Sequence, residues 1–192
     1  DYLASCTQLR RLLLDDCYNL KTTFEVLKHL PHLQMLRANT NNKMLLTGSV
    51  DPINALTQIV DLQLQECRRL TGKIESAFTA AMSRSLVRLE LSHTKFEGEL
   101  SSLSKCESLQ YLILCECSAL TGELSAFKSL VDLLVLDVSG CCNISGSLDS
   151  LSDCQRLTSL NLLGCIKIEG TLDAFSYMAE LELLVLDGCK GI

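Results

Sequence analysis

Cysteine is the residue type in this sequence that could most readily bind a metal ion or take part in redox chemistry. The chain has 192 residues, of which eleven are cysteine and three are histidine. Thiolates and imidazoles are the usual ligands of structural zinc, and pairs of thiols form disulfides or redox centres. However, no two cysteines have the C-x-x-C spacing of zinc ribbons and thiol oxidoreductases. The chemistry of the cysteines therefore depends on where a fold would place them.

Six of the cysteines recur in one repeating position of the sequence. They are Cys17, Cys67, Cys117, Cys141, Cys165 and Cys189. Asn41 and Thr94 occupy the same position in the two intervening segments. Amides and hydroxyls are poor substitutes for thiolates as metal ligands, but all three residue types are small and carry a polar hydrogen. We therefore expect a structural ladder that donates to backbone carbonyls, and we expect no metal and no cofactor.

The remaining cysteines have less regular positions. Cys6, Cys106 and Cys154 share a second recurring position, where small buried apolar groups are expected. Cys115 is expected on an exposed strand face and Cys142 in the loop after a strand, so these two are the candidate reactive thiols. Free thiols in repeating positions favour a reducing compartment.

An arrangement resembling a hydrolase triad can be drawn from the sequence. Ser92 and His93 are adjacent, and Glu66 and Glu116 have matching positions in the flanking segments. Adjacent residues do not by themselves form a nucleophile–base pair, and nothing in the sequence indicates an oxyanion hole. The sequence also lacks a phosphate-binding loop and a dinucleotide-binding fingerprint. We therefore expect that the chain is not an enzyme.

All these positions belong to one repeating pattern that covers the chain. The pattern L-x-x-L-x-L-x-x-C starts at eight anchors separated by 24, 26, 27, 23, 24, 24 and 24 residues. The anchors are Leu9, Leu33, Ile59, Leu86, Leu109, Leu133, Leu157 and Leu181. Eight copies of one period predict a repeat protein whose units stack to bury their leucines.

The pattern resembles the leucine-rich repeat family over essentially the whole chain. The segment Leu120-Thr121-Gly122-Glu123-Leu124 is similar to the L-x-G-x-L signature of the 24-residue plant-type subclass. The sequence departs from that subclass in lacking the usual following proline and in having cysteine where asparagine is typical. The resemblance implies an α/β fold, a right-handed leucine-rich repeat solenoid with a curved parallel sheet, and a general role in binding.

The spacing of the leucines predicts the elements independently of the family. In Leu160-Asn161-Leu162 both leucines point inward and Asn161 points outward, as in a strand. Strands are expected near residues 11–14, 35–38, 61–64, 88–91, 111–114, 135–138, 159–162 and 183–186. They form a parallel sheet on the concave face of the solenoid. Helical spacing predicts convex helices over 23–30 and 75–84, and the insertion around Asn39 to Lys43 is irregular.

Composition limits the partners. The net charge of −6 argues against nucleic acid, and no apolar run is long enough for a membrane span. The chain opens without methionine and closes within the pattern, so we expect one solenoid over residues 1–192 that is part of a longer protein. The partner is therefore expected to be another protein.

Outward apolar residues indicate where such a partner would bind. The first four repeats present mainly polar residues on the concave face, whereas the last four present more apolar ones. One expected cluster is Tyr111, Ile113 and Val135, and a second is Leu163, Leu183 and Val185. Exposed apolar groups that lie together often mark an interface.

Three functions are compatible with this pattern. The first is an intracellular protein-interaction module within a larger protein or assembly, in the cytoplasm or another reducing compartment. The second is a ligand-binding receptor ectodomain, which the L-x-G-x-L segments favour. The third is a rigid architectural spacer in a complex.

Overall fold

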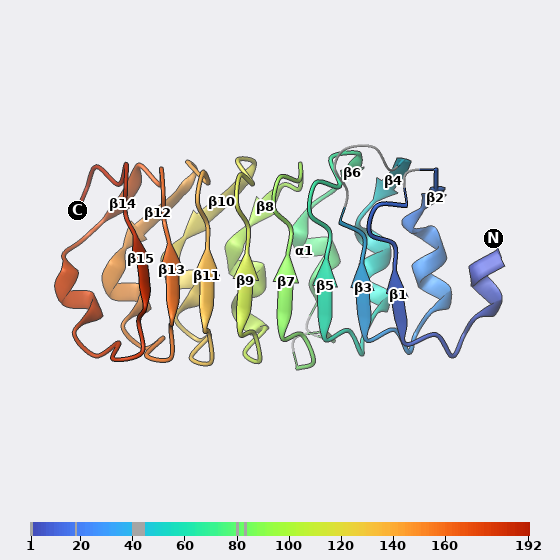
Figure 1. Cartoon of the computed structure of the whole chain (residues 1–192), viewed down its shortest axis with the longest axis horizontal. Coiled ribbons are helices and arrows are strands. Elements are labelled where there is room, and N and C mark those ends of the chain that lie inside the picture. Colours follow the sequence, from blue (N-terminus) through green and yellow to red (C-terminus); the bar gives the residue numbers. More distant parts are fainter. Residues whose placement is uncertain (1, 18, 40–44, 80, 83) are drawn as a thin grey trace.

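The eight predicted strands form one parallel sheet along a long side of the molecule (Figure 1). The computed structural model describes residues 2–17, 19–39, 45–79, 81–82 and 84–192. The chain winds as a solenoid, and each strand lies within one residue of its expected bounds. In spatial order the strands are β1 (Arg11–Leu13), β3 (Met35–Arg37), β5 (Asp61–Gln63), β7 (Arg88–Glu90), β9 (Tyr111–Ile113), β11 (Val135–Asp137), β13 (Ser159–Asn161) and β15 (Leu183–Val185).

Each strand has a buried middle residue between two outward ones. Leu89, Leu112 and Leu136 are opposite one another in the register of β7, β9 and β11, and all three are fully buried. Burying a leucine side chain contributes about 1.5–3 kcal/mol. The solenoid is therefore stabilised by stacking one row of leucines on the next.

A second row of short parallel strands, which the sequence did not predict, follows the turn after each of the first seven main strands. β2 (Lys21–Thr23), β4 (Leu45–Ser49) and β6 (Leu70–Thr71) form a three-stranded sheet. β8 (Gly98–Glu99), β10 (Leu120–Glu123), β12 (Ile144–Ser147) and β14 (Lys167–Glu169) form a four-stranded sheet. Gly122 shows why these strands contain glycine. Its φ is 126°, and an added Cβ would lie 3.2 Å from the backbone nitrogen of Leu100 in the preceding repeat.

Short helices lie behind the main sheet, on the opposite side of the solenoid (Figure 1). Seven are 3₁₀ helices, the tighter helix used in short connections. These are η1 (Tyr2–Ser5), η2 (Phe24–His29), η3 (Asp51–Ala55), η4 (Leu100–Lys105), η5 (Leu124–Phe127), η6 (Leu148–Leu151) and η7 (Leu172–Phe175). The one α-helix among the described residues is α1 (Ile74–Ala77). None of the described helices is long and apolar enough to cross a membrane.

The two predicted helices differ from their expected form. The helix expected over 23–30 is η2, a 3₁₀ helix, and the one expected over 75–84 ends already at Ala77. α1 ends because Phe78, whose side chain is buried in the core, leaves the helical conformation with φ −99° and ψ 87°. Of the irregular segment from Asn39 to Lys43, only Asn39 lies within the described residues.

The core fills the space between the main sheet and the helices. It consists mainly of leucines that are wholly buried in the interior repeats, with Phe96 and Phe127 among the largest side chains. The last strand differs. Leu184 is 37% exposed, whereas Leu160 at the same position of β13 is fully buried. β15 pairs with a strand on one side only.

Candidate binding surface

The parallel register arranges the outward side chains of the concave face in two rows. The first residue of each strand belongs to one row and the third residue to the other. Neighbouring side chains of a row come from strands about 4.8 Å apart. From β7 to β15 the first row is Arg88, Tyr111, Val135, Ser159 and Leu183, and the second is Glu90, Ile113, Asp137, Asn161 and Val185.

The first expected apolar cluster lies on β9 and β11. Tyr111 is directly opposite Val135, and Ile113 lies on the same face as Tyr111, two residues further along β9. All three side chains are half-buried. The structure therefore brings these three residues together on the concave face.

Arg88, on the neighbouring strand β7, lies over the aromatic ring of Tyr111. Its guanidinium carbon lies 5.1 Å from the centre of the Tyr111 ring. A cation over an aromatic ring contributes about 0.5–1 kcal/mol at an exposed site. Sequence reasoning missed this contact, although both residues occupy the same position after their anchors and are therefore opposite in register. Arg88 marks the border between the polar and the apolar half of the face.

The second apolar group lies at the end of the sheet. Leu183 and Val185 are on β15, and Leu163 follows β13. Leu163 is 47% and Leu183 is 50% exposed, which makes them the most accessible of the six predicted residues. Ser159 and Asn161 of β13 separate this group from the first. The structure does not join the two groups into one continuous patch.

The polar residues between the two groups bond to one another. The carboxylate of Asp137 accepts hydrogen bonds from the backbone N–H of Ser139 (2.9 Å), from its hydroxyl (2.6 Å), and from the side chain of Asn161 (3.0 Å). The amide oxygen of Asn161 accepts from the backbone N–H of Leu163 at 3.1 Å. Since unpaired polar groups are costly to cover, this bonding lowers the cost of placing a partner over the gap.

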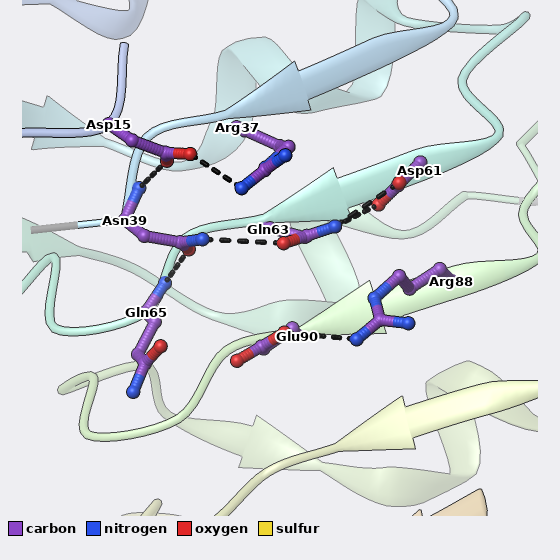
Figure 2. A network of polar contacts seen from close by, with 8 residues as sticks. All are labelled: Asp15, Arg37, Asn39, Asp61, Gln63, Gln65, Arg88 and Glu90. Atoms are coloured by element: carbon purple, nitrogen blue, oxygen red, sulfur yellow. Dashed lines mark hydrogen bonds and ion pairs between the residues drawn. The ribbon is translucent and has the colours of Figure 1, made fainter. Parts of the chain in front are cut away.

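A polar network crosses the first half of the face (Figure 2). Asp15 accepts a hydrogen bond from the backbone N–H of Asn39 (2.9 Å) and pairs with the guanidinium of Arg37 (2.7 Å). The Asn39 side chain donates to Gln63 at 3.3 Å, and Gln63 donates to Asp61 at 2.9 Å. Three consecutive repeats are thereby connected through side chains that sequence analysis placed separately on the face.

The network continues towards the centre of the sheet. The side-chain oxygen of Asn39 accepts from the backbone N–H of Gln65 at 3.0 Å, and Arg88 lies 3.6 Å from Glu90 (Figure 2). Many polar groups of this half are paired within the protein, but the Nε atoms of Arg37 and Arg88 have no hydrogen-bond partner among the described residues.

Three polar residues near the ends of the strands are buried. Ser92 and Ser139 were expected on the outward face but are only 3% and 5% exposed, because the chain turns inward directly after the strand. Within the described residues the Ser92 hydroxyl has no hydrogen-bond partner. Ser92 and His93 therefore do not form a nucleophile–base pair.

The repeated cysteines form the expected ladder of donors. Five of the six thiols donate to a carbonyl of the preceding repeat, at 3.0 Å from Cys67 to Ala38 and at 3.0 Å from Cys117 to Leu91. The same bond is made by Cys141, Cys165 and Cys189, to Leu114, Val138 and Leu162. Thr94 instead donates to Leu91 of its own repeat at 2.7 Å. Asn41 lies outside the described residues, and Cys17 in the first repeat is exposed.

Burial makes most of these thiols hard to ionise. It raises the pKa of Cys67 and Cys165 to about 12 and the pKa of Cys106 and Cys154 to about 11. Cys106 and Cys154 are buried as expected. The same expectation for Cys6 was wrong, since Cys6 is exposed in the first turn of the solenoid.

The candidate reactive thiols are both partly accessible. Burial is the main reason why the pKa of Cys115 is raised, and the negative charges of Asp137 and Glu116 raise it further. A thiol with a raised pKa is a poor nucleophile at neutral pH. Cys142 lies in the turn after β11, as expected. The described residues contain no group of three or more His, Cys, Asp or Glu side chains that could hold a metal ion.

Comparison with known proteins supports the fold. No protein-family model matches the sequence, and no curated protein sequence matches it either. Solved structures do match. The plant peptide hormone receptor RGFR1, solved in complex with RGF2, is 19% identical with a TM-score of 0.63. The match covers 95% of this chain and 32% of the receptor chain.

Bacterial proteins match to a similar degree. Internalin C2 from Listeria monocytogenes is 18% identical over 96% of this chain and 76% of its own, with a TM-score of 0.64. A leucine-rich repeat protein from Leptospira interrogans is 18% identical over 96% of this chain and 50% of its own, with a TM-score of 0.60. The chain thus has the fold of a leucine-rich repeat solenoid, and it spans only about a third to a half of two of these three proteins.

Proposed function

We propose that this chain is a protein-interaction module that binds a partner protein on the concave face of its last four repeats. The contact residues would be Tyr111, Ile113, Val135, Leu163, Leu183 and Val185. The module is a single solenoid within a larger protein or assembly. It resembles the 24-residue plant-type repeat in its L-x-G-x-L segments.

The apolar side chains on the outward face of the main sheet are the observation that carries this proposal. They are not core residues, because the leucines between them already fill the interior. Tyr111 is held by Arg88 and lies directly beside Val135. An aromatic residue in the middle of an apolar cluster is a common anchor at protein interfaces. The other half of the face presents mainly polar side chains, so the apolar contact favours the last four repeats as the binding region.

Acidic residues surround the apolar groups. Glu116 lies beyond the end of β9, Asp137 lies in the gap, and Asp187 follows β15. None of them forms an ion pair within the described part of the chain. Complementary charge steers association and selects partners, so the partner should carry a basic rim around its apolar contact.

The cysteine ladder supports a reducing compartment. The ladder thiols donate to carbonyls, so oxidation of these sulfurs would remove structural hydrogen bonds. Thiol titration of the denatured protein, purified without added reductant and protected from air, should find nearly all eleven cysteines reduced. Four or more stable disulfides would contradict this location.

A receptor ectodomain is the second candidate. One matched structure is a plant peptide hormone receptor in complex with RGF2, and another is an Arabidopsis receptor kinase ectodomain in complex with a peptide hormone ligand. In this case the same concave face would take an extended peptide. The third candidate, an architectural spacer, predicts that no substitution on this face weakens a specific complex.

The binding test compares two pairs of apolar-to-serine substitutions on the same face. Tyr111→Ser with Val135→Ser removes the first apolar cluster, and Leu13→Ser with Met35→Ser is the matched control in the first two repeats. Both pairs leave the net charge unchanged and lie on outward strand positions. The partner is identified by cross-linking to the wild-type protein, and its affinity for each folded variant is then measured.

The expected result is a loss of affinity of about tenfold or more for the Tyr111 pair and little change for the control pair, since truncated anchor residues typically cost more than about 1 kcal/mol. Weaker binding by the control pair alone would place the partner on the first repeats instead. Unchanged affinity in both variants would contradict a role for the Tyr111 cluster in binding.

A further inference from the structure

A small surface pocket lies where the cysteine ladder is interrupted. It has a volume of about 190 Å³ and is lined by Arg68, His93, Thr94, Lys95 and Glu116. These residues come from the turns that follow β5, β7 and β9, so the pocket spans three consecutive repeats at the edge of the concave face. The proposed protein-binding cluster does not include any of them.

The pocket collects positive groups on an acidic protein. Arg68 and Lys95 occupy the same position in consecutive repeats, nine residues after their anchors, and both line the pocket. Like charges on neighbouring repeats repel each other. Arg68 has only a long contact of 3.9 Å with Glu66, and in the described part of the chain Lys95 forms no ion pair. An anion between them would relieve the repulsion.

The backbone hydrogen bonds at the pocket differ from those at the same position of the other repeats. In six repeats the residue at the ladder position donates its backbone N–H to the carbonyl three residues earlier, as Cys117 does to Leu114 and Cys141 to Val138. Thr94 instead uses its hydroxyl for the Leu91 carbonyl. The backbone N–H of Thr94 lies against the buried sulfur of Cys117. Among the described residues, the backbone N–H of Lys95 has no acceptor. A free backbone N–H beside cationic side chains can add a charge-assisted hydrogen bond to a bound anion.

Glu116 is the one acidic residue of the pocket wall, and its carboxylate turns away from the fourth repeat. A Cβ added to Gly140, in the sixth repeat, would lie 2.7 Å from the carboxylate carbon of Glu116. The carboxylate therefore lies over the turn of the sixth repeat. It leaves Arg68, His93 and Lys95 as the groups that face a ligand.

We propose that this pocket binds an oxyanion, either the phosphate or the carboxylate of a ligand. Arg68 and Lys95 supply the charge, and the imidazole of His93 and the backbone N–H of Lys95 supply hydrogen bonds. The charge-assisted bonds from Arg68 and Lys95 provide most of the affinity.

Amide NMR of the whole chain tests the proposal. Sodium phosphate and, separately, sodium acetate are titrated at constant ionic strength against sodium chloride. The expected result is a saturable shift of the Thr94 and Lys95 amide signals with at least one of the two anions. Saturation by phosphate alone assigns the pocket to phosphate groups, and saturation by acetate alone assigns it to carboxylates. Saturation by both anions means that the pocket accepts either group.

Two double variants with the same change in net charge provide the control. Arg68→Gln with Lys95→Gln should weaken anion binding by about tenfold or more, because a hydrogen bond to a charged group is lost at each position. Lys105→Gln with Lys128→Gln removes two exposed cations at or beside η4 and η5 and should bind like the wild type. The proposal is overturned if neither anion saturates the two amides, or if the pocket variant binds as tightly as the control. The variant pair Tyr111→Ser with Val135→Ser should lose affinity for the partner protein but bind the anion as the wild type does. The protein-binding proposal and the anion-binding proposal can therefore fail independently.

Discussion

At the scale of single residues, the repeated cysteines of this protein have a structural role as hydrogen-bond donors. A thiol is a weaker donor than an amide, but five of these thiols reach a carbonyl at 3.0–3.1 Å. The ladder position is buried in the interior repeats, so its carbonyls have no access to water. Thr94 shows that a hydroxyl also suffices there, although it bonds within its own repeat.

The buried thiols predict a loss of stability in alkali. The pKa of Cys67, Cys106, Cys154 and Cys165 is raised in the folded state, to between about 11 and about 12. The unfolded thiols ionise first, from about pH 8.5, so the unfolded state binds fewer protons and the free energy of unfolding falls as pH rises. Each such thiol contributes a slope of about 1.4 kcal/mol per pH unit between its two pKa values.

Urea unfolding in the presence of reductant, from about pH 8 to about pH 10, measures this slope. The double variant Cys106→Ala with Cys154→Ala removes two of the four thiols and should lose stability less steeply over the same range. A free energy of unfolding that does not change with pH would contradict the burial of these sulfurs.

The residue immediately before the ladder position has a positive φ in every repeat where it is described. Glycine occupies this position in the last three repeats, with φ of 71°, 73° and 80° at Gly140, Gly164 and Gly188. No atom lies within 4 Å of a Cβ added to Gly164. Gly164→Ala should therefore cost about 1–2 kcal/mol from backbone conformation alone, measured by denaturant unfolding. Gly164→Asn should cost less, because asparagine tolerates this conformation; equal costs would point to a different cause.

At the scale of elements, the main strands could be predicted because each has one leucine flanked by outward residues. Leu112 and Leu136 mark β9 and β11 without ambiguity. The second row of strands was missed because segments such as Gly98–Glu99 are too short for alternation to be visible. The 3₁₀ helices were only partly predicted, since four residues such as Leu124–Phe127 are too few to show helical spacing.

The candidate surface was predictable in its positions but not in its bonding. Sequence alignment of the repeats places Tyr111 beside Val135, and the register agrees. Alignment does not reveal that Arg88 lies over the Tyr111 ring or that Asn161 bonds to Asp137, because rotamers decide such contacts. The inward turn that buries Ser92 and Ser139 was also missed, because a strand pattern was extended two residues too far.

The strand register predicts a sharp difference between neighbouring residues of β13. Leu160 is fully buried, so Leu160→Ala should cost about 2–5 kcal/mol. Ser159 points outward and its hydroxyl makes no hydrogen bond within the described part of the chain, so Ser159→Ala should stay within about 0.5 kcal/mol of wild type. Asn161→Ala should cost about 1 kcal/mol, because it removes the bonds to Asp137 and Leu163. Chemical denaturation measures all three, and similar costs for Leu160 and Ser159 would mean that the register is wrong.

At the scale of the whole molecule, stability is distributed along the solenoid axis. Each repeat contacts mainly its two neighbours, so stability is roughly the sum of repeat and interface contributions. An interior strand such as β9 is paired on both sides, whereas β1 and β15 are paired on one side. The exposure of Leu184, compared with the full burial of Leu112 and Leu136, shows how much of the core contact the last repeat lacks.

This arrangement predicts a gradient of hydrogen-exchange protection along the chain. Amides of β7, β9 and β11 should exchange slowest, through global unfolding, and those of β1 and β15 fastest, through local opening of the end repeats. Within β15 the amide of Leu183, which donates to the Thr158 carbonyl at 3.0 Å, reports directly on undocking of the last strand. Leu112→Ala should weaken protection throughout the neighbouring repeats, whereas Leu184→Ala should act on the last repeat alone. Equal protection from β1 to β15 would contradict this prediction, because it would mean that all repeats unfold together and that the end repeats do not open locally.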